Sequence, residues 1–81
     1  MKFNLFKVRK QKKTMNIATS EVGLSARSYN CLMRTGVSTL GDLTVMNKSQ
    51  LYKIRNLGKS NIEEIERVLQ KYGLKLLEEN N

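Results

Sequence analysis

A repeating pattern of apolar residues near the end of the chain limits its fold more than any other feature. The pattern consists of Ile62, Ile65, Val68, Leu69 and Tyr72. Intervals of three and four residues place these side chains on one face of an α-helix. Gly73 follows directly and can adopt the left-handed conformation that ends a helix. The pattern therefore predicts a terminal helix that needs a partner surface to cover its apolar face.

Three shorter helices are predicted before it, because the sequence repeatedly combines a capping residue, a short apolar segment and a break. They are expected over about residues 26–35, 37–45 and 48–55, opened by Ser25, by Ser38 or Thr39, and by Asn47. Asp42 and Gln50 stand three residues after Thr39 and Asn47, the spacing of a capping box. Gly36 separates the first two helices. No segment alternates as a half-buried strand does, so the pattern indicates a compact all-α domain of four to five short helices.

The chain is long enough for one small domain only. We expect a helical domain over residues 21–77, on which Leu74, Leu76 and Leu77 fold back, and a polar tail over residues 78–81. With no histidine and a single cysteine among 81 residues, the protein lacks the usual general base and any disulfide framework. We interpret the glutamates at 63, 64 and 66 as helix-dipole residues rather than metal ligands. A catalytic site, a metal and a cofactor are therefore not expected, nor is a membrane segment.

The basic charge is concentrated at the start of the chain. Residues 1–20 hold six lysines and arginines and no acid, whereas residues 21–81 hold nine against seven acids, and the whole chain has a net charge of +8. The run within residues 7–13 contains Lys7, Arg9, Lys10, Lys12 and Lys13. Repulsion among like charges and the absence of helical phasing predict a mobile arm. Such an arm either contacts nucleic-acid phosphates or remains a solvated tail.

The segment from Asn56 to Asn61 is the most informative candidate site. A Leu57-Gly58 pair between two predicted helices allows a tight turn and leaves the next helix start uncovered. Free backbone N–H groups at a helix start attract anions, and Lys59 and Ser60 add a cation and a hydroxyl donor. Helix-hairpin-helix modules hold a nucleic-acid backbone in this way. Alternatively, Gly58 is only a turn residue, and Ser60 is an N-cap with Glu63 completing a capping box.

A second candidate lies on the first predicted helix. Arg27, Asn30 and Arg34 follow one another at intervals of three and four residues, so they share one helix face. Arginine and asparagine are side chains that enter a minor groove or pair with phosphate. When the segment is considered alone, the pattern is more typical of a solvated polar face.

Taken together, these segments resemble the C-terminal domain of the bacterial RNA polymerase alpha subunit. The runs that carry the resemblance are residues 23–32 (GLSARSYNCL), residues 36–37 with 41–43, and residues 56–59 followed by 63–65. They agree with the family in order and spacing over about residues 20–77. The resemblance implies a small all-α, helix-hairpin-helix-related fold in a cytoplasmic, nucleoid-associated bacterial protein that is monomeric as an isolated domain.

The resemblance also implies partners and site residues. Members of the family bind A·T-rich promoter DNA through the minor groove and contact sigma factor and transcription activators. By position, Arg27 would enter the groove with Asn30 beside it. The residues implied near the DNA backbone are Asn56, Gly58, Lys59, Ser60, Asn61 and Glu64. The alternative is a protein-interaction module that binds a regulator or a polymerase component with little DNA binding of its own.

Two positions depart from the family pattern. After Asn-Leu-Gly the family usually has two basic residues and then serine, whereas this chain has Lys59-Ser60-Asn61. One fewer cation near phosphate predicts weaker DNA binding with a lower salt dependence. Gly23 stands where the family often has an acid that contacts an activator or sigma factor. In the family this domain follows a larger assembly domain, so the sequence fits either an independent relative or an excerpt of such a subunit.

Overall fold

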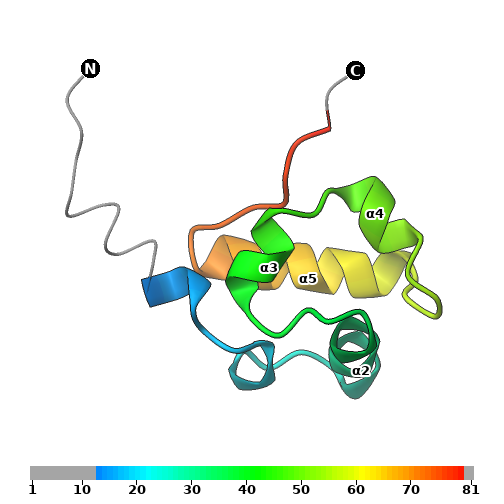
Figure 1. Cartoon of the computed structure of the whole chain (residues 1–81), viewed down its shortest axis with the longest axis horizontal. Helices are drawn as coiled ribbons and strands as arrows, with labels where there is room; N and C mark the ends of the chain where they lie inside the picture. The colour runs from blue at the N-terminus through cyan, green and yellow to red at the C-terminus, as the bar shows by residue number, and fades with distance from the viewer. Residues whose placement is uncertain (1–12, 80–81) are drawn as a thin grey trace.

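Helices form the regular structure of residues 13–79, which are the residues that the computed structural model describes (Figure 1). A helical turn over residues 13–15 comes first. The elements that follow are the 3-10 helix η1 (Thr19–Glu21) and the α-helices α2 (Ala26–Arg34), α3 (Leu40–Thr44), α4 (Lys48–Tyr52) and α5 (Lys59–Lys71). Across residues 13–79 the only β pairing is an isolated antiparallel bridge between Ala18 and Thr39. The all-α class with short helices, as expected from the sequence, is confirmed.

The helix starts follow the capping residues in the sequence. The Ser25 hydroxyl accepts a hydrogen bond from the Ser28 N–H at the start of α2. At α3 the Thr39 N–H donates to the Asp42 carboxylate (3.1 Å), and the Asp42 N–H donates back to the Thr39 hydroxyl (3.3 Å). Asn47 forms the matching capping box at the start of α4. Two lengths differ from expectation: α3 begins at residue 40 rather than 37, and α4 ends at residue 52 rather than near 55.

Helix α5 is the central element of the core. Its Ile62, Ile65 and Leu69 are fully buried, as the helical spacing predicts. Helices α2 and α4 lie on opposite sides of its N-terminal half in Figure 1, and both contact it. The other fully buried leucines are Leu32, Leu40, Leu43 and Leu51, one or two from each shorter helix. Helices α2, α3 and α4 thus contribute their apolar residues to one core with α5, and this packing positions the ends of α2, α4 and α5 relative to one another.

The packed domain begins before residue 21, where the sequence suggested its boundary. The Thr19 N–H donates to the Ser38 carbonyl (2.9 Å), the Leu40 N–H donates to the Ile17 carbonyl (3.0 Å), and Thr19 is 1% exposed. Met15 also packs on the core, and a Cβ at Gly41 would lie 3.0 Å from the Met15 carbonyl oxygen. Residues 13–20 therefore belong to the fold, because their backbone groups pair with the loop before α3. The charge pattern of the sequence does not report such pairing.

The C-terminal residues return along the core as expected, with one exception. Gly73 ends α5 with a φ of +75°, and Leu74 is buried. Exposure then alternates, so that Leu76 is partly buried and Leu77 is 53% exposed. The Leu77 N–H donates to the Met46 carbonyl (2.9 Å), which holds this segment beside the start of α4. The expectation that Leu77 packs on the core is wrong, since neighbouring residues of an extended segment face opposite sides.

None of the helices within residues 13–79 combines the length and the apolar character that crossing a bilayer requires.

Candidate nucleic-acid interface

The start of α2 and the loop between α4 and α5 enclose a shallow hollow of about 520 Å³. In Figure 1 this loop projects from the N-terminal end of α5 toward the side on which α2 lies. Arg27 lines the hollow from α2, and residues 52–58 line it from α4 and the loop. Ser60 and Asn61 complete it from the first turn of α5. Two candidate sites that are separate in the sequence therefore form one surface.

Three other predicted residues lie close to the hollow without lining it. Asn30 is exposed on α2, one turn beyond Arg27. Lys59 is the exposed first residue of α5, between two residues that line the hollow. Glu64 lies one turn further along α5, and its carboxylate is bonded to the start of α2. Of the basic arm, Lys13 is exposed in the first helical turn, and Lys7, Arg9, Lys10 and Lys12 lie outside the described residues.

A series of side-chain hydrogen bonds connects α5 to α2 behind the hollow. The Gly58 N–H donates to the Asn61 Oδ1 (3.1 Å), and the Asn61 Nδ2 donates to the Ser28 hydroxyl (3.0 Å). The Ser28 hydroxyl in turn donates to Glu64, whose other oxygen accepts from the Ser25 N–H (3.0 Å). Ser28 is fully buried. These bonds hold the helix turn that carries Arg27 against the loop that carries Gly58.

This arrangement corrects the alternative reading of the α5 start. Gly58 is the N-cap, and Asn61 stands at the third helical position with its side chain on the Gly58 N–H. Ser60 is therefore inside the helix, and Glu63 completes no capping box with it. The sequence suggested Ser60 because serine is a preferred N-cap. The sequence does not show that Ser28 of α2 lies beside Asn61. The Ser28 hydroxyl accepts a hydrogen bond from the Asn61 amide and so fixes its orientation.

Asn56 and Leu57 determine how the loop is presented. Asn56 has a φ of +69°, a left-handed conformation that asparagine tolerates better than most residues with a side chain. Leu57 is buried, so it anchors the loop between the exposed residues Asn56 and Gly58. Gly58 itself has a φ of −92°, and a Cβ there would meet only the Asn61 Oδ1 at 3.7 Å. Nothing in the packing of residues 13–79 therefore requires glycine at position 58.

The hollow is basic, and no carboxylate among residues 13–79 pairs with its cations. Arg27, Lys53 and Arg55 line it, and none of their side chains forms a hydrogen bond or an ion pair with any of residues 13–79. Sequence reasoning missed Lys53 and Arg55, although both lie within three residues of Asn56. They were overlooked because the predicted third helix extended to about residue 55. The early end of α4 places both residues in the loop instead.

Glu64 is held in its charged form by its partners. Partial burial of the Glu64 carboxyl raises its pKa, but the hydrogen bonds from Ser28 and Ser25 together outweigh this effect. Arg67 adds a smaller favourable charge, and the pKa lies below the usual value for glutamate. The carboxylate therefore acts as an acceptor for α2 at neutral pH.

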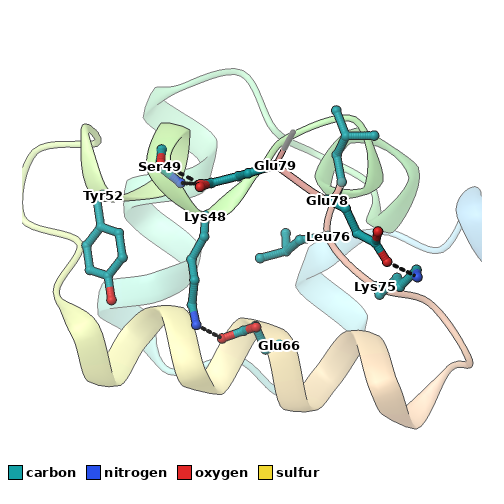
Figure 2. Close-up of a pocket in the computed structure, with 9 residues that line it drawn as sticks. Lys48, Ser49, Tyr52, Glu66, Lys75, Leu76, Glu78 and Glu79 are labelled. Carbon is teal, nitrogen blue, oxygen red and sulfur yellow. Dashed lines mark hydrogen bonds and ion pairs between the residues drawn. The ribbon is translucent and has the colours of Figure 1, made fainter. Parts of the chain in front are cut away.

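A second hollow, of about 440 Å³, lies between α4, α5 and residues 75–79 (Figure 2). Two of its three carboxylates are paired with lysines, with Lys48 3.4 Å from the Glu66 carboxylate and Lys75 2.6 Å from that of Glu78. Glu79 accepts hydrogen bonds from Ser49. Tyr52 and Leu77, which also line it, are 50% and 53% exposed. The paired charges make this surface a weak site for a polyanion and leave exposed apolar area.

The residues described hold no cluster of three or more histidine, cysteine, aspartate or glutamate side chains that could bind a metal.

Comparisons with known proteins agree on one family. Residues 7–71 match the family model for the C-terminal domain of the bacterial RNA polymerase alpha chain. The DNA-directed RNA polymerase alpha subunit of Malacoplasma penetrans is 46% identical over 74 residues, which are 91% of this chain and 22% of that protein. The alpha subunit of Clostridium beijerinckii is 44% identical over 67 residues, 83% of this chain and 21% of that one. The protein thus spans about a fifth of the length of these curated relatives.

The fold has a similar match. The NMR structure of the C-terminal domain of the RNA polymerase alpha subunit from Helicobacter pylori superposes with a TM-score of 0.72 at 31% sequence identity. The match covers 79% of this chain and 56% of that one.

Proposed function

Because this chain belongs to the family of non-catalytic C-terminal domains of bacterial RNA polymerase alpha chains, we propose that it binds A·T-rich double-stranded DNA through the minor groove. The observation that carries the proposal is the unpaired Arg27 on the same hollow as residues 56–58. A narrow A·T-rich minor groove has a strongly negative potential, which favours an inserted arginine without base-specific hydrogen bonds. Phosphates beside the groove would meet the loop and the start of α5.

The lack of a side chain at Gly58 supports the same binding mode. The fold accepts a Cβ at this position, so a requirement for glycine would come from a ligand that approaches the backbone closely. Asn56, Lys59 and Ser60 are exposed beside Gly58 and can donate to phosphate oxygens. Asn61 and Glu64 act differently in this proposal, because their side chains are bonded within the domain. We assign them to positioning Gly58 and Arg27.

A salt-dependent titration tests the proposal. The protein is titrated with A·T-rich and G·C-rich duplexes of equal length by fluorescence anisotropy, with and without residues 1–12. We expect tighter binding of the A·T-rich duplex by both proteins. Removal of the arm should reduce the salt slope by about 0.9 for each phosphate that the arm neutralises. Binding that vanishes without the arm, together with no preference for A·T-rich DNA, would show that the folded domain is not the DNA-binding element.

A protein partner is a second function, favoured by the second hollow. Exposed Tyr52 and Leu77 border a concave surface on which both lysines are already paired with carboxylates. Such a surface suits an apolar side chain of another protein better than a phosphate. We infer that RNA polymerase, a sigma factor or a transcription regulator contacts this face while the basic hollow holds DNA.

A substitution at Leu77 separates the two functions. Leu77 lies in the second hollow only, whereas Tyr52 borders both. Leu77→Ser should weaken binding to purified RNA polymerase or sigma factor, measured by biolayer interferometry, and leave DNA affinity unchanged. If Leu77→Ser binds RNA polymerase and sigma factor as tightly as the unaltered protein does, this face is not the contact surface.

A further inference from the structure

Lys53 and Arg55 are two cations of the basic hollow to which the site described above gives no role. Both are exposed, and both line the hollow that Arg27 also borders. The two ion pairs within residues 13–79 are formed by Lys48 and Lys75, which lie at the other hollow. Lys53 and Arg55 thus combine exposure, a concave setting and the absence of a carboxylate partner in the described part of the chain.

The backbone that carries these two cations is well fixed. The Lys53 N–H donates to the Gln50 carbonyl (3.2 Å), and the Ile54 N–H donates to the Leu51 carbonyl (3.1 Å). The Leu57 N–H returns to the Ile54 carbonyl (3.2 Å), and the Leu57 side chain is buried. Binding an anion here would therefore order two side chains but not the loop, which keeps the entropic cost low.

The two walls of the hollow carry different numbers of cations. The first turn of α5 has Lys59 beside the hollow and a serine at position 60 that lines it, so this turn offers one cation. The opposite wall, residues 52–58, supplies two. An arginine can hold a phosphate through two parallel hydrogen bonds, which makes Arg55 the stronger of the two candidates.

We propose that Arg55 and Lys53 bind phosphates of the DNA strand beside the groove that Arg27 enters, and that they compensate for the cation absent at Ser60. The inference rests on the proposed DNA-binding function and adds residues to it. Its consequence is that the cationic side chains of the loop between α4 and α5 bind the DNA backbone in addition to the first turn of α5.

The test is a salt series with the full chain and an A·T-rich duplex. The variants are Arg55→Gln, Lys53→Gln and the double change. Their control is Lys71→Gln, which removes an exposed charge about 18 Å along α5 from its first residue. We expect each single change in the loop to reduce the slope of log K against log salt by about 0.9, and the double change by about twice that. Lys71→Gln should leave the slope unchanged. Circular dichroism melting should be unaltered in all variants, since none of these side chains has a partner in residues 13–79.

Two further proteins make the outcome decisive. Ser60→Lys, added to Arg55→Gln, should restore the original slope, because it returns a cation to the same hollow. The inference is overturned if the slope of log K against log salt is the same for Arg55→Gln, Lys53→Gln and Lys71→Gln. If Arg27→Ala still weakens binding in that case, the proposed function stands without it. If the unaltered protein binds no duplex in the series, the proposed function fails, and the inference fails with it.

Discussion

Arg27→Ala is expected to weaken binding to an A·T-rich duplex by about 1–3 kcal/mol, which is roughly 5- to 150-fold in Kd. Arg27 is exposed, lines the basic hollow and has no partner within residues 13–79 that would hold it away from DNA. The loss should be larger for A·T-rich than for G·C-rich DNA, because the narrow groove provides the favourable potential. Fluorescence anisotropy with both duplexes at one salt concentration measures the difference.

The matched control for this experiment is Arg34→Ala. Arg34 is exposed on the same helix, about 10 Å further along its axis, and does not line the hollow. Its removal changes the net charge equally, so it reports the general electrostatic contribution. If the two variants lose the same affinity and keep the same duplex preference, Arg27 has no special place in the groove, and the net charge of the domain explains binding.

Of the substitutions considered, Glu64→Ala should destabilise the fold most, lowering the free energy of unfolding by about 1–3 kcal/mol. The change removes the acceptor of the Ser28 hydroxyl, which is fully buried, and of the Ser25 N–H at the α2 start. A buried hydroxyl and a backbone N–H that both lose their acceptor cost free energy, although the Ser25 cap of α2 itself remains. For a domain of this size the melting temperature should fall by about 4–8 °C per kcal/mol. DNA affinity should fall as well, because Arg27 lies between Ser25 and Ser28.

Glu63→Ala is the matched control, since the Glu63 side chain is exposed and forms no hydrogen bond or ion pair with residues 13–79. It should change the free energy of unfolding by less than about 0.5 kcal/mol. Thermal melts followed by circular dichroism compare the two variants with the unaltered protein. Equal melting temperatures for Glu64→Ala and Glu63→Ala would mean that the bonds from Glu64 to α2 contribute little.

Melts over a range of pH reveal how the Glu64 contribution depends on ionisation. The pKa of Glu64 is lowered in the folded domain, so the unfolded chain takes up its proton first as the pH falls. The stabilisation is therefore complete above the usual glutamate pKa of about 4.3 and is lost as the pH falls through the lower value of the folded state. The difference in the free energy of unfolding between the unaltered protein and Glu64→Ala should therefore narrow as the pH falls below the usual glutamate pKa. Asp42, whose pKa the Ser38 and Thr39 N–H groups lower, contributes to both proteins equally.

Asn61 illustrates where sequence reasoning reached its limit. From the sequence it is a departure from the family pattern, an amide in the place of a hydroxyl, and it was assigned to DNA contact. The structure instead shows its amide joining Gly58 to Ser28, two residues that are 30 positions apart in the sequence. Only the packing of α5 against α2 brings these groups within hydrogen-bond distance, so no local pattern could have revealed the bridge.

The early part of the domain shows a similar limit. Met15, Ile17 and Thr19 lie in a stretch that the charge pattern separates from the fold, yet they pack on the core or pair with the loop before α3. Their contacts are made by backbone groups and by scattered apolar side chains, neither of which produces a periodic pattern. The boundary inferred from charge was therefore placed too late.

Local sequence patterns specified the starts of α2, α3 and α4 and the apolar face of α5, because spacing and capping chemistry act between residues at most four positions apart. Ser25, Thr39 and Asn47 start their helices as their local sequences predict. Tertiary structure decided how Arg27, the loop of residues 53–58 and the start of α5 form one basic hollow. It also decided that Glu64 and Asn61 turn inward, since the packing of α2 against α5 supplies the partners that satisfy their polar groups.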